Sequence, residues 1–231
     1  MQKNLCPEGL LCVREFNDVP LNYTHALTGE VLSLYGKVGL SVYPNLLEHY
    51  CHEGHYCPRA THEMVPCPVG TYNRLKGRKS LLDCQLVEGG YFVDTEGSST
   101  WSGECAIGHY CPDGSTTNYQ VKCPKGTFRS ITRGSKPSDC SICTSGQYCD
   151  EEGMSDTKEC PQGYYCPLGT IIPEPCPEGS YGATTGLTDS KSCTPCPSGY
   201  YCGKRSLTSP ETQCDEGYYC IEGAKRPEPT D

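Results

Sequence analysis

Residues 176–202 read CPEGSYGATTGLTDSKSCTPCPSGYYC, and this stretch contains both of the cysteine spacings on which the chain is built. Sixteen residues separate Cys176 from Cys193, and five separate Cys196 from Cys202. The 20 cysteines of the 231-residue chain divide without remainder into pairs of these two kinds. The short pairs are Cys6/Cys12, Cys51/Cys57, Cys105/Cys111, Cys143/Cys149, Cys160/Cys166, Cys196/Cys202 and Cys214/Cys220, and the long pairs are Cys67/Cys84, Cys123/Cys140 and Cys176/Cys193.

The pairs follow one another in a fixed order with a period of 54 or 55 residues, marked by Cys51, Cys105, Cys160 and Cys214. A fixed period of this length is the signature of a repeat architecture. The order predicts repeats at 51–104, 105–159 and 160–213, the end of an incomplete repeat at 1–12, an insert at 13–50 and the start of an interrupted repeat at 214–231.

One repeat lacks a short pair, and the loss indicates how the cysteines bond. Where CTSGQYC stands at 143–149, the preceding repeat has VEGGYFV at 87–93, so that Val87 and Val93 replace two cysteines together. Two partners lost together are expected to be bonded to each other. Six cysteines allow 15 connectivities, and closing the second short pair reduces these to three. The isolated Cys6/Cys12 has no long pair nearby, which favours a disulfide within each short pair. The cysteines of each long pair are then left to bond to each other.

Zinc is the alternative use of these cysteines. The sequences CSIC at 140–143 and CTPC at 193–196 have the spacing of zinc knuckles, in which four thiolates hold the metal. If the site held zinc, replacing only the cysteines at positions 87 and 93 by valine would leave half of its ligands. The replacement of just these two cysteines therefore favours disulfides. A redox C-x-x-C motif is less consistent still, because no βαβ pattern surrounds either sequence.

The composition requires cross-links. Val, Ile, Leu and Phe number only 36, and the net charge is −9. So little apolar surface cannot offset chain entropy unless disulfides replace a core, and each closure constrains the unfolded chain by about 2–3 kcal/mol. The prediction is an array of small disulfide-rich repeats, with short β-hairpins, loops and little helix, arranged as an extended rod or solenoid.

Disulfides of this density place the chain outside the cell or on its surface. The acidic balance argues against nucleic acid as a partner, and no stretch approaches the roughly 20 apolar residues of a membrane span. The start, MQKNLCPEGLLC, does not resemble a signal peptide, so a mature product or a piece of a longer chain is expected.

Each short pair carries a glycine three residues after its first cysteine, and most carry a tyrosine before the second. The glycine predicts a turn with positive φ. The tyrosines, together with Tyr72, Phe128 and Tyr181 in the long loops, are expected to form a miniature core in each repeat. A ligand-binding tyrosine surface is the alternative.

The insert at 13–50 contains 13 of the 36 large aliphatic and Phe residues. Residues 29–44, GEVLSLYGKVGLSVYP, alternate in places and predict two short strands around a turn at Tyr35-Gly36-Lys37. The insert is expected to cover the first repeat or to supply an assembly contact through Leu32, Leu34, Val38, Leu40 and Val42. It also holds the glycosylation sequon Asn22-Tyr23-Thr24.

No catalytic motif, cofactor motif or established metal pattern is found, so the chain is not expected to be an enzyme. His49, His52, His55 and His62 with Glu53 are a candidate metal cluster, although an incidental solvated group is the simpler interpretation. The acidic Asp150-Glu151-Glu152-Gly153 lacks the ligand pattern of an EF-hand, and calcium there is a secondary alternative.

The cysteine pattern of the repeats resembles that of the ephrin-receptor-like cysteine-rich repeats and is distantly similar to TNF-receptor and growth-factor-receptor modules. The pattern is C-P-x-G-[ST]-[YF]…C-x-x-C-P-x-G-x-Y-C and is clearest at 176–202. The resemblance covers 51–220 and part of 1–12, but not 13–50. The resemblance implies a receptor, adhesion or surface protein. The ligand-binding and kinase domains of ephrin receptors are absent here, so kinase signalling is not carried over. The expected function is a structural subunit of a surface filament or appendage that self-associates; the alternative is a receptor or adhesin ectodomain that binds a protein ligand.

Overall fold

The computed structural model describes residues 8–9, 22–24, 31–33, 50–59, 61 and 63–228. These fall into two compact units that interleave along the sequence. Unit 1 comprises the residues up to Glu104 together with Pro112–Asn118, and unit 2 comprises Cys105–Cys111 and the residues from Tyr119 onward.

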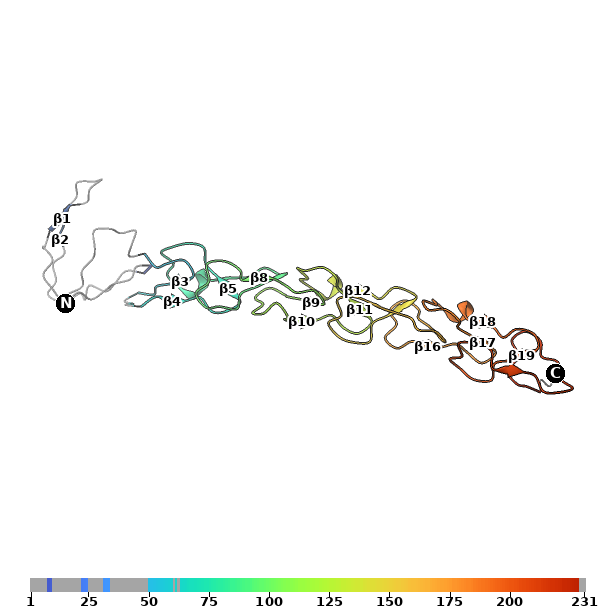
Figure 1. Cartoon of the computed structure of the whole chain (residues 1–231). Coiled ribbons are helices and arrows are strands. Elements are labelled where there is room, and N and C mark those ends of the chain that lie inside the picture. Colours follow the sequence, from blue (N-terminus) through green and yellow to red (C-terminus); the bar gives the residue numbers. More distant parts are fainter. Residues whose placement is uncertain are drawn as a thin grey trace. The chain divides into compact units, whose positions relative to one another are not determined.

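Both units are built from tandem β-hairpins with very short strands, which from β3 onward are two residues long (Figure 1). In unit 1 the hairpins pair β3 (His55–Tyr56) with β4 (Val65–Pro66), β5 (Thr71–Tyr72) with β6 (Gln85–Leu86), and β7 (Tyr91–Phe92) with β8 (Gly103–Glu104). In unit 2 they pair β9 (His109–Tyr110) with β10 (Val121–Lys122), β11 (Thr127–Phe128) with β12 (Ser141–Ile142), β13 (Gln147–Tyr148) with β14 (Lys158–Glu159), β15 (Tyr164–Tyr165) with β16 (Glu174–Pro175), β17 (Ser180–Tyr181) with β18 (Thr194–Pro195), and β19 (Tyr200–Tyr201) with β20 (Thr212–Gln213). All pairings are antiparallel, and each joins strands that are consecutive in the sequence.

The sequence prediction of short hairpins with almost no helix is confirmed. The helical content of the described residues consists of three single 3-10 turns, which lie in the long cysteine loops: η1 (Leu81–Asp83), η2 (Pro137–Asp139) and η3 (Ser190–Ser192). Aspartate side chains hold these turns. Asp139 Oδ2 accepts hydrogen bonds from the backbone amides of Ser135 and Lys136, at 2.7 and 3.2 Å.

Nine disulfides join the described cysteines, and each of them closes a pair of the short or the long spacing. The short closures are Cys51–Cys57, Cys105–Cys111, Cys143–Cys149, Cys160–Cys166, Cys196–Cys202 and Cys214–Cys220. The long closures are Cys67–Cys84, Cys123–Cys140 and Cys176–Cys193. The partners are therefore those that elimination favours from the spacing. Cys6 and Cys12 lie outside the described residues, so their closure stays a prediction.

The geometry of these closures fits disulfides and not a metal site. Their Cα–Cα distances of 5.7–6.1 Å fall within the ordinary range for disulfides. No cysteine among the described residues is free, so the structure does not assign them to zinc.

Successive hairpins are joined by a recurring set of four backbone hydrogen bonds. From the hairpin of Cys51 to that of Cys67, the Gly54 amide donates to the Asn73 carbonyl (2.7 Å) and the Gly54 carbonyl accepts from the Cys67 amide (2.8 Å). The Cys51 carbonyl accepts from Gly77 and the Cys57 amide donates to Arg78, both at 2.8 Å. The same four bonds recur at every junction within one compact unit whose two hairpins are fully described.

Where the turn of a hairpin packs against an adjoining loop, the turn glycine is required. At Gly146, φ is +83°, and a Cβ built there would lie 2.7 Å from the carbonyl oxygen of Gly186 in the adjoining loop. A side chain would therefore collide with backbone that cannot move without breaking the junction. This observation confirms the positive φ that the sequence predicts at this position and explains its cause.

Sulfur fills most of the interior. Among the described residues, the fully buried side chains are half-cystines, with Val87 and Val93 at 1% and 0% exposed. The two valines pack with Tyr72, and Tyr91 lies against this cluster. The positions of the tyrosine and phenylalanine residues in the sequence predict that their rings form the core of each repeat. Instead, rings such as Tyr148 and Phe128 are half-buried, because the cystines occupy the centre.

The half-cystines are not all enclosed to the same degree. Cys166 and Cys220, which end short closures, have no exposed surface. Cys84 and Cys214 are only half-buried. Cys84 directly follows η1, none of whose residues is buried, so the first long closure is more open to water on this side than the other two long closures, in which Cys140 and Cys193 are buried.

Within the insert, β2 (Val31–Ser33) pairs with β1 (Asn22–Thr24), in the register Tyr23↔Leu32. The two strands predicted within residues 29–44 stay a prediction. Leu34, Val38, Leu40 and Val42 lie outside the described residues. A pairing between polar Asn22-Tyr23-Thr24 and an apolar strand has no alternating pattern from which it could be predicted.

Candidate interaction surfaces

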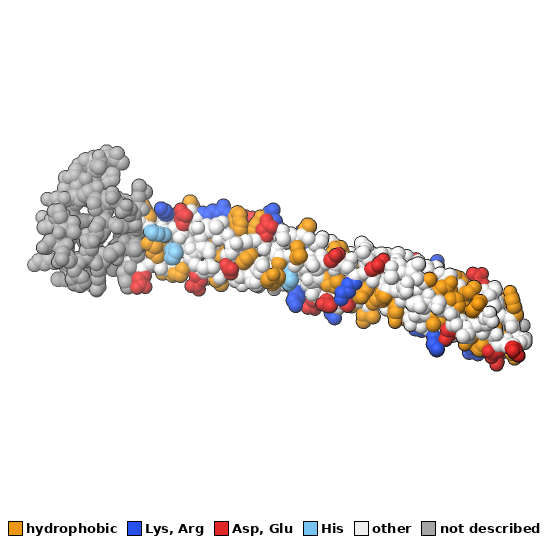
Figure 2. All heavy atoms as spheres, viewed as in Figure 1, with side chains coloured by type: hydrophobic (Ala, Val, Ile, Leu, Met, Phe, Trp, Pro, Cys, Tyr) orange, Lys and Arg blue, Asp and Glu red, His pale blue; other side chains and the backbone are white. Residues whose placement is uncertain are grey.

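Because cystines occupy the interior, many large apolar side chains project into solvent. Leu82 in η1 is 93% exposed and Ile172 is 76% exposed. In Figure 2, hydrophobic side chains gather in groups between charged ones on the visible face of unit 2. The exposed surface of the described residues therefore offers apolar side chains for specific contacts.

One group of exposed apolar residues, here called the isoleucine patch, consists of Ile142, Leu168, Ile171 and Ile172. The ends of β12 and the Leu168–Ile172 loop meet because the Gly169 amide donates to the Cys143 carbonyl at 2.8 Å. Ile142 Cγ2 lies 3.4 Å from the position of a Cβ at Gly169. All four side chains are between 41% and 76% exposed.

The other repeats do not reproduce this patch. At the positions equivalent to Ile142, Leu168, Ile171 and Ile172, the preceding repeat carries Leu86, Asp113, Thr116 and Thr117, and the following one carries Pro195, Glu222, Lys225 and Arg226. The hairpin fold therefore does not require apolar residues here. An apolar group restricted to one repeat is typical of a contact site.

The tyrosines that precede the closing cysteines lie on the hairpin edges. Tyr165 is half-buried, and its hydroxyl donates to Glu174 Oε2 at 2.6 Å across the β15–β16 hairpin. This hydrogen bond to a carboxylate raises the pKa of the Tyr165 phenol above its usual value of 10.0. In the Cys214 hairpin, by contrast, Tyr219 is 72% exposed, so its ring is free for contact.

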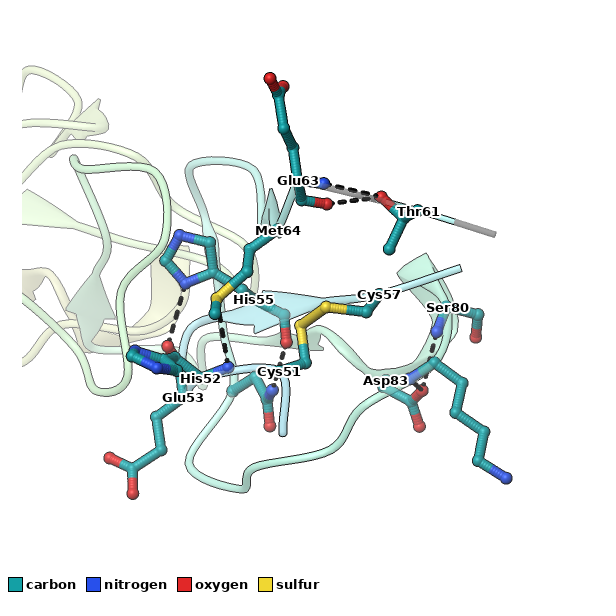
Figure 3. Close-up of a disulfide and its surroundings, with 12 residues drawn as sticks. Cys51, His52, Glu53, His55, Cys57, Thr61, Glu63, Met64, Ser80 and Asp83 are labelled. Carbon is teal, nitrogen blue, oxygen red and sulfur yellow. Dashed lines mark hydrogen bonds between the residues drawn. A yellow bond between two sulfur atoms is a disulfide. The ribbon is translucent and has the colours of Figure 1, made fainter. Parts of the chain in front are cut away.

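Of the candidate histidine cluster, the structure describes His52, His55 and Glu53, and it does not group these three as a metal site. His55 Nδ1 bonds the Glu53 carbonyl at 3.0 Å, and the His52 amide lies 3.5 Å from Met64 Sδ (Figure 3). His49 and His62 lie outside the described residues. In the part of the chain that is described, no group of three His, Cys, Asp or Glu side chains is placed to hold a metal ion.

The acidic segment that begins at Asp150 is occupied by a cation of the protein itself. Lys158 Nζ lies 2.8 Å from Asp150 Oδ1 and 3.1 Å from Glu151 Oε1. These hydrogen bonds raise the pKa of Lys158 and lower that of Asp150. An ammonium in this position competes with calcium for the same oxygens.

The predicted assembly and glycosylation residues are only partly placed. Asn22 begins β1, and Leu32 lies at the centre of β2 opposite Tyr23. Their roles remain predictions. Within the described part of the chain, no helix has the length and apolar character needed to cross a membrane.

No protein-family model matches the chain. Among curated proteins, it is similar to Cysteine repeat modular protein B of Toxoplasma gondii. The two are 28% identical over an alignment 230 residues long, which covers 76% of the chain. It is also 31% identical, over 48% of its length, to Sushi, von Willebrand factor type A, EGF and pentraxin domain-containing protein 1 of Rattus norvegicus.

The matched regions span only 3–4% of the length of these relatives. The similarity therefore concerns a module and not a whole protein. The relatives and the nine disulfides describe a cysteine-rich repeat protein, and the disulfides favour an extracellular location.

Proposed function

We propose that the chain is an extracellular structural repeat protein, a disulfide-stapled rod that serves as a subunit of a surface filament or appendage. The observation that carries the proposal is the uniform junction between hairpins. Within each compact unit, four backbone hydrogen bonds fix a described hairpin on the next, and a disulfide closes most of these hairpins, so that they follow one another with the same local geometry. Such nearest-neighbour stacking is characteristic of solenoids. The repeats are proposed to be of the ephrin-receptor-like kind.

Assembly between subunits requires surfaces that a neighbour can cover. The exposed Tyr218 and Tyr219 of the Cys214 hairpin, at 50% and 72%, supply one. The insert is proposed to supply another, through Leu32, Leu34, Val38, Leu40 and Val42. An N-linked glycan on Asn22 would lie on the same insert and limit which of its faces can be covered.

Sedimentation and electron microscopy of the unreduced chain test this proposal. A filament subunit forms extended assemblies whose mass rises with concentration. Deleting residues 28–44, which removes β2, should abolish those assemblies while the disulfide-closed hairpins remain folded. Outside the insert, the one cysteine-free stretch long enough for a matched deletion is 85–104, and it contains the β7–β8 hairpin. The full-length chain carrying N22Q therefore serves as the control. Assembly that survives the deletion would exclude the insert as a contact.

The isoleucine patch favours a second function, a receptor or adhesin ectodomain that binds a protein ligand. The exposed apolar group that contains Ile142 and Ile171 occurs in only one repeat. A group that does not recur suits a single ligand site better than a periodic filament contact. In this case the chain sediments as a monomer at all concentrations. The double variant I142S/I171S would then lose ligand binding without a change in sedimentation.

A further inference from the structure

Residues 74–79 of unit 1, RLKGRK, form a cationic segment in an acidic protein. This basic loop holds four of the 19 lysines and arginines, although the net charge of the chain is −9. The equivalent loops of the next two repeats, SITRGS at 130–135 and ATTGLT at 183–188, hold one basic residue and none. The fold therefore accommodates this loop without the charges, and their concentration here needs another cause.

The backbone of the basic loop is held in place by hydrogen bonds. Asn73, which is 3% exposed, accepts from the Leu75 amide at 3.0 Å and donates through Nδ2 to the Leu75 carbonyl at 2.9 Å. The Gly77 amide donates to the Cys51 carbonyl at 2.8 Å. A loop fixed in this way presents its charges with a smaller entropic cost on binding than a mobile one.

Three of the four cations, Arg74, Lys76 and Lys79, have no carboxylate partner among the ion pairs of the described residues. Arg78 Nη1 lies 3.6 Å from Asp83 Oδ1, whose pKa is lowered first by backbone hydrogen bonds from Lys79 and Ser80 and further by the charge of Arg78. Lys76 and Lys79 are exposed, and the ion pairs of the described residues do not include them. In Figure 2, Lys and Arg side chains are grouped along one margin of unit 1.

Arg74 links the basic loop to the single tryptophan. The Arg74 guanidinium lies 4.8 Å from the centre of the Trp101 ring and 5.2 Å from that of Tyr72. Trp101 also packs on Tyr91 with ring centres 5.0 Å apart, yet it remains 40% exposed. A partly exposed indole held beside a guanidinium offers an apolar face next to fixed positive charge.

We propose that the basic loop and Trp101 together bind a sulfated polysaccharide. Arg74, Lys76 and Lys79 would hold the sulfate groups by charge-assisted hydrogen bonds, and a sugar ring would lie against the exposed part of Trp101. An extracellular location brings the site into contact with polymers of this class and away from nucleic acids. This binding is separate from assembly into a filament and does not depend on it.

Because Trp101 is the only tryptophan, its fluorescence reports on this site alone. The test is a titration of the disulfide-intact chain with a heparin octasaccharide, followed by tryptophan emission and by calorimetry, at two salt concentrations. The expected result is a change of emission on binding, with an affinity that falls as salt rises. The variant K76A/K79A should weaken binding by at least about tenfold, since two charged contacts are lost.

The matched control is K191A/K225A, which removes the same charge from exposed lysines of unit 2 and should change Kd by less than about twofold. Circular dichroism and thiol titration confirm that the variants are folded and oxidised. Equal weakening by both pairs would overturn the proposal, as would hyaluronan binding as tightly as heparin, because hyaluronan carries no sulfate. Phosphatidylserine vesicles that bind more tightly than heparin, and compete with it, would identify a membrane surface instead.

Discussion

Val87 and Val93 are buried side by side in one cluster with Tyr72, at the two positions that bonded half-cystines occupy in the other short hairpins. The junction bonds of this hairpin are retained: the Val87 amide donates to Gly70 and the Val93 amide to Ser115, each at 3.0 Å. Apolar packing therefore replaces a covalent bond without altering the backbone. The repeat that contains the valines is the one whose stability depends on side-chain burial.

Restoring the cysteines tests whether the two positions are equivalent. The variant V87C/V93C should form the disulfide spontaneously and raise the free energy of unfolding by about 2 kcal/mol, because the closed loop is short. Thiol titration and denaturant unfolding measure the two effects. Two cysteines that stay reduced under air would show that the valine hairpin differs in geometry from its neighbours.

Truncation of the same pair should have the opposite effect. V93A removes two methyl groups from a side chain with no exposed surface, with an expected loss of about 1–3 kcal/mol of stability. Hydrogen exchange should localise the loss to residues 87–104. Unchanged protection there would mean that the disulfides of adjacent hairpins, and not the valines, hold this segment.

The turn glycines allow a comparison between two sites with the same backbone conformation. Gly146 and Gly199 have φ of +83° and +86°, but only Gly146 faces a carbonyl of the adjoining loop, while Gly199 has no atom within 4 Å among the described residues. G199A should therefore cost only the backbone strain, about 1 kcal/mol. G146A should cost clearly more, because the Gly186 carbonyl must move, and thermal unfolding of the two variants measures the difference. Similar costs would argue against close contact between hairpins.

Acid should destabilise the long cysteine loops first. Hydrogen bonds from Ser135, and in part the nearby Arg129, lower the pKa of Asp139 below its usual 3.8 in the folded protein. Since the folded-state pKa is depressed, Asp139 contributes stability above about pH 4, and this contribution is lost as the pH falls through the lowered pKa. D139N should be less stable than the parent at pH 6, and the difference should shrink toward pH 2 in urea unfolding. A difference that is independent of pH would show that the carboxylate charge has no role.

The cysteine spacing predicts which hairpins exist because a five-residue loop has few ways to close. The spacing does not show that each long cysteine loop begins with a hairpin of the same kind as the short closures. In the long loops, Asn73, Arg129 or Gly182 stands where the second half-cystine of a short closure would be. The hairpin is recognisable there only from its backbone hydrogen bonds. Buried Arg129, which donates to the Thr132 carbonyl at 2.9 Å, resembles a surface residue in the sequence.

A second set of glycines is regularly spaced in the sequence, and this spacing also indicates where hairpins join. Gly97, Gly153 and Gly186 follow the first residue of a hairpin by ten positions and also have positive φ. They donate the junction bonds to Cys67, Cys123 and Cys160. The isoleucine patch and the aromatic neighbours of Arg74 had no such signal, because they join residues from different loops.

Disulfide mapping of the native chain tests the serial closure of neighbouring cysteines most directly. Digestion without reduction, followed by electron-transfer fragmentation, assigns the partner of each sulfur. Serial closure predicts Cys140 bonded to Cys123 and Cys143 to Cys149, and the same pattern in the next repeat, with Cys193 bonded to Cys176 and Cys196 to Cys202. Bonds that cross between these pairs, or free thiols with bound zinc, would contradict it.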